Sequence, residues 1–396
     1  MTAGAGVAPA RLRAWLRLVC APGIGPRAAL ELAGRFGGDP EAALAAGEAA
    51  LRRAGVPAAT AAALAAGEPE AAERALAWAA ARPGRHLLAI DDPRYPERLR
   101  DLADPPLVLH VVGDPEVLAL PQVAVVGSRR PTPAGRDTAR EFARALAASG
   151  LVVTSGLALG VDGAAHEGAL GAEGGGAGGL TVAVCATGLD RVYPAAHAAL
   201  AARIVQGGGA LVSEMPPGTP PRPGLFPRRN RIIAALAHGV LVVEAGVRSG
   251  SLITARLALE LGREVMAVPG SIHNPLARGC NALIRQGAKL VETAADVLEE
   301  IAPRLGEAAA RLRRHAPGEP AQPAAAPAEA DDPDYARLLA AMEETPLAVD
   351  VLVERTGLTP GEVSSMLLIL ELEGRVASTA GGLYARVPAR DQDRKP

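Results

Sequence analysis

The sequence predicts an α/β protein with a doubly wound parallel sheet, and residues 81–301 carry the two observations behind this prediction. The first is a series of short runs of Val, Leu, Ile and Ala that are apolar on both faces, as strands covered on both sides must be. The second is that helical segments separate most of these runs, which favours parallel strands joined by right-handed crossovers.

The order of these elements locates the candidate site. Six runs are predicted as strands, at residues 123–126, 151–154, 181–185, 210–213, 240–244 and 264–268. Five segments between them are predicted as helices, at residues 133–149, 161–170, 195–206, 227–237 and 251–261. Because such sheets bind ligands beyond the carboxyl ends of their strands, the loops that follow the strands are where we expect a site.

Composition separates three further parts of the chain. Residues 1–80 are rich in Ala, Leu and Arg and are predicted to form a small all-α domain. Residues 302–334 are rich in Pro, Ala and charge and bury too little apolar surface to fold, so they are predicted to be a linker. Residues 335–388 return to a compact pattern of two helices and a hairpin, which is typical of a winged helix.

Charge and cysteine content exclude several classes of protein. The formal net charge is −2, so any anion site must be a local patch, and since lysine occurs only at Lys289 and Lys395 the patch must use arginine. Three widely spaced cysteines predict neither a disulfide framework nor a zinc site, and no cofactor is expected. The start resembles no signal peptide and no apolar run is long enough to span a bilayer, which predicts a cytoplasmic protein without membrane contact.

Two glycine-bearing loops follow the first two strands of this region. Gly127, Ser128 and Arg129 combine close backbone approach, a hydroxyl and a guanidinium, which suit a phosphate, although an ordinary turn with a solvated arginine has the same pattern. Residues 155–162 (SGLALGVD), with Gly156, form a second loop able to present N–H donors. Asp162 and His166 are one helical turn apart and are expected to pair, bracing this loop rather than acting on a substrate.

A basic segment follows the fourth strand. It joins an aromatic ring to clustered arginines without an acidic residue, which is the combination that single-stranded nucleic acid needs for base stacking and phosphate contact. A solvated basic helix start is the alternative, but arginines there oppose the helix dipole. The candidate binding residues in this segment are Arg222, Phe226, Arg228, Arg229, Asn230 and Arg231.

The fifth strand ends at Glu244 and is followed by a small-residue loop, Ser249, Gly250 and Ser251, that opens a helix and is a third candidate anion site. Glu244 is expected either to bond a ribose or base edge or to hold the arginines in place. Cys280 has no histidine and acid arranged with it in the sequence to make it a nucleophile, so it is expected to be packed.

Five motifs occur in order along this region: GSR at 127–129, SGLALGVDGAAH at 155–166, FPRRNRIIAAL at 226–236, VVEAGVRSGSLITA at 242–255 and AVPGS at 267–271. Together they resemble the DNA processing protein A (DprA/Smf) family. The resemblance implies an extended Rossmann domain that binds single-stranded DNA, protects incoming DNA and helps load the RecA recombinase in natural transformation, acting as a homodimer. It also implies a DNA pocket formed by Gly127, Ser128, Arg129, Gly156, Phe226, Arg229 and Asn230.

One position departs from the family's pattern, whereas the segments before and after residues 81–301 agree with the family. Where the family commonly has a lysine, this chain has Pro223, so Arg222 is expected to take over its role. Residues 22–27 (PGIGPR) resemble a helix-hairpin-helix, and residues 335–388 resemble the family's winged helix. The second helix of that winged helix carries Glu362, Glu371 and Glu373 and no basic residue, which favours a protein-interaction role over duplex binding.

A non-enzymatic DNA-binding protein is therefore the leading hypothesis. The main alternative is a nucleotide phosphoribohydrolase on a related scaffold, whose PGGxGTxxE motif is absent here. A nicotinamide-dependent oxidoreductase is disfavoured because neither glycine loop has the required spacing and no acid ends the second strand. A duplex-specific regulator, inferred from the winged helix alone, is the third hypothesis.

Overall fold

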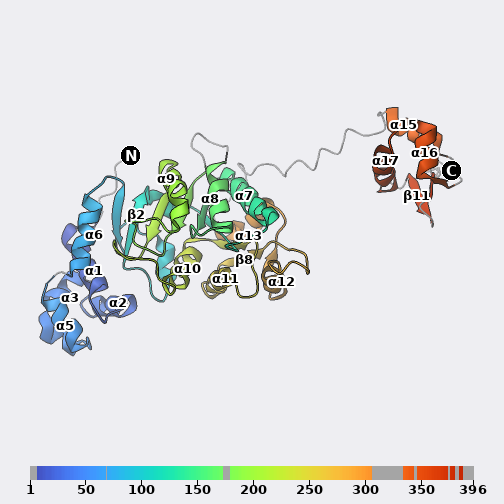
Figure 1. Ribbon diagram of the computed structural model, residues 1–396. Helices are drawn as coiled ribbons and strands as arrows, with labels where there is room; N and C mark the ends of the chain where they lie inside the picture. Colours follow the sequence, from blue (N-terminus) through green and yellow to red (C-terminus); the bar gives the residue numbers. More distant parts are fainter. Residues whose placement is uncertain are drawn as a thin grey trace, which may run out of the picture. The chain divides into compact units, whose positions relative to one another are not determined.

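The computed structural model describes residues 7–67, 69–172, 179–305, 333–342, 346–372, 375–379 and 383–386. The chain divides into two compact units, Met1–Pro317 and Gly318–Pro396 (Figure 1). Each unit has its own core of buried apolar residues. The predicted domain boundaries at residues 80, 301 and 334 stay predictions. Helix α13 (Ala294–Leu305) continues through residue 301.

The first unit is built on a nine-stranded sheet in the order β1-β2-β6-β5-β4-β3-β7-β8-β9. Strands β3 to β9 pair in parallel, whereas β2 is antiparallel to both of its neighbours. The strands are β1 (Arg85–Ala89), β2 (Val108–Gly113), β3 (Gln122–Val126), β4 (Val152–Ser155), β5 (Thr181–Val184), β6 (Ala210–Ser213), β7 (Gly239–Val242), β8 (Glu264–Ala267) and β9 (Lys289–Leu290).

All six predicted strands are present within one or two residues of their expected ends, which confirms the doubly wound α/β fold. Strands β1, β2 and β9 were not predicted. Strands β1 and β2 are antiparallel and are joined through a 3-10 helix, η1 (Glu97–Asp101), so the alternation of strand and helix that reveals a parallel sheet does not extend to them.

Helices cover both faces of the sheet (Figure 1). Odd-numbered residues of β3, such as Val123 and Val125, are buried in a core with α7, α8 and α13. Even-numbered residues, such as Ala124 and Val126, are buried in a second core with α9 to α12. The helices are α7 (Pro133–Ala148), α8 (Val161–Leu170), α9 (Ala198–Gln206), α10 (Leu225–Leu236), α11 (Ser251–Glu260) and α12 (Arg278–Arg285).

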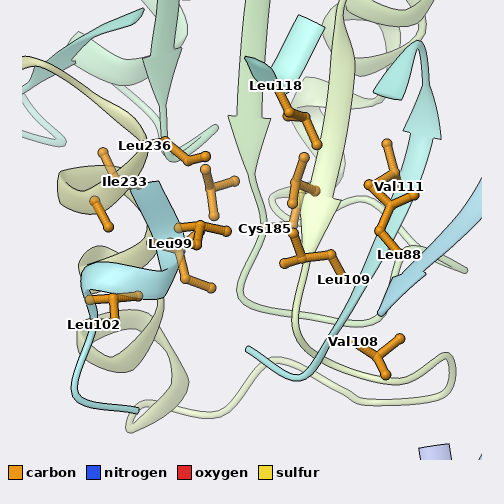
Figure 2. Close-up of a cluster of buried hydrophobic side chains, with 14 of the residues drawn as sticks. Leu88, Leu99, Leu102, Val108, Leu109, Val111, Leu118, Cys185, Ile233 and Leu236 are labelled. Carbon is orange, nitrogen blue, oxygen red and sulfur yellow. The ribbon is translucent and has the colours of Figure 1, made fainter. Parts of the chain in front are cut away.

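The described part of the first 80 residues contains only helices, as expected, and their core is continuous with that of the sheet. Trp15 Nε1 donates a 2.9 Å hydrogen bond to Asp91, which follows β1. Figure 2 shows another part of this core, where Leu99 and Leu102 near η1 lie close to Ile233 and Leu236 of α10. The helices are α1 (Pro9–Cys20), α2 (Pro26–Arg35), α3 (Pro40–Ala45), α4 (Gly47–Arg53), α5 (Ala58–Ala65) and α6 (Glu70–Ala80).

The second unit has the predicted helix–helix–hairpin pattern, with a three-stranded sheet in the order β10-β12-β11. Thr359 and Glu362 form a reciprocal capping box at the start of α17. Glu373 lies outside the described residues. The elements are α15 (Pro333–Ala341), β10 (Leu347–Ala348), α16 (Val349–Thr356), α17 (Pro360–Leu372), β11 (Val376–Thr379) and β12 (Leu383–Arg386).

Within the described ranges, every helix is too short or too polar to cross a membrane. In the same residues His, Cys, Asp and Glu form no group that could hold a metal ion.

The buried His110 should make the first unit sensitive to acid. Burial lowers the pKa of His110 from 6.5 to about 4, so below pH 6.5 the unfolded chain binds a proton that the folded chain does not. Stability is therefore lost as pH falls from 6.5 towards 4, by about 2 kcal/mol between pH 7 and pH 5. Urea unfolding followed by tryptophan fluorescence measures this, because both tryptophans, Trp15 and Trp78, belong to the first unit.

His110→Asn should remove about that much of the pH-dependent loss, whereas the control His273→Asn, at an exposed position, should leave the loss unchanged. An identical loss in wild type and His110→Asn would contradict the assignment.

Candidate nucleic-acid interface

A cavity of about 910 Å³ opens beyond the carboxyl ends of β3 and β7, where the strand order reverses. The loops after these two strands, the start of α10 and the segment before α12 line it. Nine of the thirteen predicted binding residues are among its lining residues: Gly127, Ser128, Arg129, Phe226, Arg229, Asn230, Ser249, Gly250 and Ser251. The structure does not bring Gly156, Arg222, Arg228 or Arg231 into the lining.

The loop after β3 is held in place by its backbone. Ser128 N–H donates a 2.6 Å hydrogen bond to the Glu244 carbonyl, and Val161 N–H donates to the Ser128 carbonyl at 3.0 Å. A Cβ on Gly127 would lie 2.7 Å from Val161 Cγ2, so only glycine fits there. The Ser128 and Arg129 side chains are thus presented to the cavity from a fixed backbone.

The Glu244 carboxylate fixes the same loop from its other end. It accepts hydrogen bonds from the backbone N–H and the hydroxyl of Thr132, both at 2.8 Å, and Thr132 in turn caps α7. A Cβ on Gly135 would lie 2.3 Å from this carboxyl group. Of the two roles expected for Glu244, holding the arginines is therefore wrong, because its carboxylate is bound to a threonine instead.

Arg229 is buried, and its guanidinium bonds groups of the protein itself. Its Nη1 donates to the Gly156 carbonyl at 2.6 Å and also to the Val184 carbonyl, while the charge faces Asp162. A Cβ on Gly156 would lie 2.4 Å from Arg229 Nη1, so a larger residue there would displace the guanidinium. We expected Arg229 to contact phosphate, but it joins the ends of β4 and β5 beneath the cavity.

Asp162 braces the loop after β4, as expected, but not together with His166. Its carboxylate accepts hydrogen bonds from the N–H groups of Gly156 at 3.1 Å and Ala158 at 3.3 Å. Burial raises the pKa of Asp162, and Arg229 opposes that shift. The predicted pairing of Asp162 with His166 is wrong, because His166 is buried with Nδ1 2.7 Å from the Thr181 hydroxyl.

Two of the predicted arginines are held by a buried carboxylate outside the cavity. Arg231 forms ion pairs with Glu214 at 2.5 Å and with Asp104 at 3.3 Å, and Arg228 pairs with Glu214 at 3.1 Å. Burial raises the pKa of Glu214, and the two arginines counter that shift. Arg222 is exposed, and its neighbour Pro223 lines the cavity in its place.

Cys280 is packed, as predicted. Its thiol lies against the carbonyl groups of Val242 and Val243, and burial raises its pKa to about 11. A thiol with so high a pKa is a poor nucleophile at neutral pH.

An arginine and two aromatic rings are in contact at the cavity. The Arg129 guanidinium carbon lies 5.3 Å from the centroid of the Phe226 ring, within the range of a cation–π contact. The Phe226 and Tyr193 rings lie 5.6 Å apart at an interplanar angle of 49°, and Tyr193 is 46% exposed. We name these three residues the aromatic wall. Sequence reasoning missed Tyr193, because it belongs to a long loop after β5 that carries no glycine–arginine motif.

The charges that remain free in the cavity are positive. Arg129, Arg248 and Arg278 are exposed in its lining, and no described carboxylate forms an ion pair with them. The one acidic residue in the lining, Asp162, is buried and faces Arg229. Three uncompensated guanidiniums around one hollow attract an anion. Arg248 was visible in its motif but not selected, and Arg278 gave no sequence signal.

Arg229→Ala should lower the free energy of unfolding by about 3–5 kcal/mol, because it leaves Asp162 and two carbonyl groups buried without their partner. Arg129→Ala should change it by no more than about 0.5 kcal/mol, since Arg129 is exposed. Urea unfolding followed by tryptophan fluorescence compares the two. Equal stability of both variants would show that Arg229 is not structural.

Two models of known protein families match this chain. The family model described as DNA recombination-mediator protein A matches residues 86–302, and the model described as DprA winged helix domain matches residues 322–382. The second match agrees with the helix–helix–hairpin fold of the second unit.

Several relatives share much of the chain. Protein Smf of Escherichia coli is 43% identical over 308 residues, which are 77% of this chain and 78% of that protein. DNA processing protein DprA of Streptococcus pneumoniae is 47% identical over 213 residues, 54% of this chain and 73% of that protein.

A solved structure of a related protein agrees in fold. The X-ray structure of DNA processing protein A from Streptococcus pneumoniae aligns with a TM-score of 0.62 at 34% identity, over 75% of this chain and 99% of that one. A structure from Helicobacter pylori, reported for its single-stranded DNA binding mode, aligns over 53% of this chain and 92% of that one, with a TM-score of 0.47 at 33% identity. With one family model matching residues 86–302 and relatives similar over most of their length, the chain belongs to the DNA processing protein A (DprA/Smf) family.

Proposed function

We propose that the protein binds single-stranded DNA in the cavity beyond β3 and β7. The observation that carries this proposal is the aromatic wall, in which the Arg129 guanidinium lies over the Phe226 ring and the Phe226 ring contacts the exposed Tyr193 ring at a tilt. A ring face accepts a base by stacking, and a neighbouring guanidinium accepts the phosphate, which is how single strands are bound without reading their sequence.

The same features favour a single strand over a duplex. A base reaches an aromatic face only when it is unstacked from its neighbours, and a single strand offers such bases at little cost. The described part of α17 carries Glu362 and Glu371, and acidic groups repel the backbone phosphates of a duplex. The cavity therefore provides the main DNA contact, and the second unit is a protein-interaction module.

We further propose that the protein protects incoming DNA and helps load the RecA recombinase, acting as a cytoplasmic homodimer. Membership of a family whose model is described as a recombination mediator supports a role beside a recombinase. A protein that covers single strands through phosphate and stacking contacts shields them from nucleases and holds them extended for a second protein.

The protein is proposed to act without catalysis. Both carboxylates at strand ends have structural partners: Glu214 pairs with Arg228 and Arg231, and Glu244 binds Thr132. The phosphoribohydrolase alternative needs a carboxylate free to act in the cavity, and Asp162, the acid in the lining, is occupied by the backbone of its own loop.

Arg129→Ala should weaken binding of oligo-dT by about 1.5 kcal/mol or more and lower the magnitude of the salt slope by about 0.7, because one charge-assisted phosphate contact is lost. Phe226→Ala should weaken binding by about 1–3 kcal/mol without changing the slope, because stacking releases no counterions. Fluorescence anisotropy at several salt concentrations measures both quantities.

Arg130→Ala is the matched control, since Arg130 is an exposed neighbour that does not line the cavity. The site assignment is wrong if Arg129→Ala and Arg130→Ala bind alike, or if both cavity variants keep wild-type affinity.

The purified protein should release no base from nucleoside monophosphates and hydrolyse no ATP above background. Chromatography of AMP incubations and a phosphate-release assay with ATP test this. Sustained turnover that disappears in Glu244→Gln, while oligo-dT affinity survives, would replace the binding-protein proposal by the phosphoribohydrolase alternative.

A further inference from the structure

The cavity has a second basic region that the aromatic wall does not include. It consists of Val247, Arg248, Ile253 and Arg278, which we name the arginine wall. Arg248 and Val247 belong to the loop between β7 and α11, Ile253 lies in the first turn of α11, and Arg278 begins α12. None of these residues lies in a segment that forms the aromatic wall.

Two segments far apart in the sequence are fastened together to make this wall. Ala245 N–H donates a 2.7 Å hydrogen bond to the Leu276 carbonyl, and Gly279 N–H donates a 2.7 Å bond to the Ala245 carbonyl. A Cβ on Gly279 would lie 2.4 Å from the Ala245 oxygen, so the backbones touch. The approach fixes the positions from which Arg248 and Arg278 extend.

Both guanidiniums are available to a ligand. Arg248 and Arg278 are exposed, and no ion pair or hydrogen bond with another described residue occupies them. Val247 is 64% exposed and Ile253 is 40% exposed beside them, so the wall also offers apolar surface. A cationic wall with aliphatic contacts suits the phosphates and the sugar and base faces of a nucleic acid strand.

The two walls belong to one continuous site. Asn230, on α10 one turn after Phe226, donates to the Gly250 carbonyl at 3.4 Å and so connects them. The volume of about 910 Å³ is near the upper end of the roughly 300–1,000 Å³ in which proteins hold whole drug-sized ligands, so the cavity takes more than one planar base.

We propose that the arginine wall is a second phosphate-binding site. It holds the nucleotides next to the nucleotide whose base stacks on the aromatic wall. This inference rests on the proposed single-strand binding and extends it. The aromatic wall anchors a strand of any length, whereas Arg248 and Arg278 contact only a strand long enough to reach them. The arginine wall therefore sets the length of single strand that the protein prefers.

The test measures anisotropy of the full chain with oligo-dT of about three and about 20 nucleotides over a range of salt. The double variant Arg248→Ala/Arg278→Ala should bind the longer strand at least about tenfold more weakly, with a salt slope smaller in magnitude by about 1.4 for two lost phosphates. Its affinity for the short strand should fall by less than about twofold. Arg129→Ala should weaken both.

Arg256→Ala is the matched control, because Arg256 is exposed on α11 but does not line the cavity. Tryptophan fluorescence confirms that each variant is folded, and Arg248→Gln/Arg278→Gln replaces the alanine pair if that pair is not. The inference is overturned if the double variant matches Arg256→Ala with the long strand, or loses affinity equally for both lengths. In either case Arg129→Ala still reports on the aromatic wall, and failure of the wild type to bind any oligo-dT would refute the proposed function itself.

Discussion

The buried Arg229 guanidinium is the interaction on which the site depends. It bonds the carbonyl groups of Gly156 and Val184, at the ends of two neighbouring strands, and its charge is balanced by Asp162 at the start of α8. A charge removed from water is stable only when such partners surround it, so the geometry has little freedom. Because Arg229 lies one turn after Phe226 on α10, the same contacts fix where the aromatic wall stands.

The charged groups in and around the site differ in whether protein groups bind them. Arg229 and Arg231 are buried and bound to protein groups. Glu214 and Glu244 are also bound, Glu214 to Arg231 and Glu244 to Thr132. Three arginines without a carboxylate partner, Arg129, Arg248 and Arg278, are exposed around one cavity. In a chain of formal net charge −2, the anion site is local: the carboxylates of Asp162 and Glu244 are bound to protein groups, and the three guanidiniums are not.

The candidate site was predictable in its loops and less so in its residues. Glycine and small polar residues after β3 and β7 were selected from the sequence, because close backbone approach needs them whatever surrounds them. The basic segment at 222–231 was read as a single binding element, and the structure divides it between buried braces and cavity-facing groups. Tyr193 and Arg278 were missed because their neighbours in sequence give no sign of what they meet in space.

The sequence by itself determined the parallel sheet, since apolar runs and helical segments alternate locally, and it identified the family through motifs that need no three-dimensional information. Only the tertiary structure decided which arginines are free. Whether a guanidinium binds a ligand depends on burial and on partners from distant segments, as Arg231 meets Asp104 and Arg229 meets Asp162. The cost of desolvating a charge is set by those surroundings, and no local pattern of residues contains them.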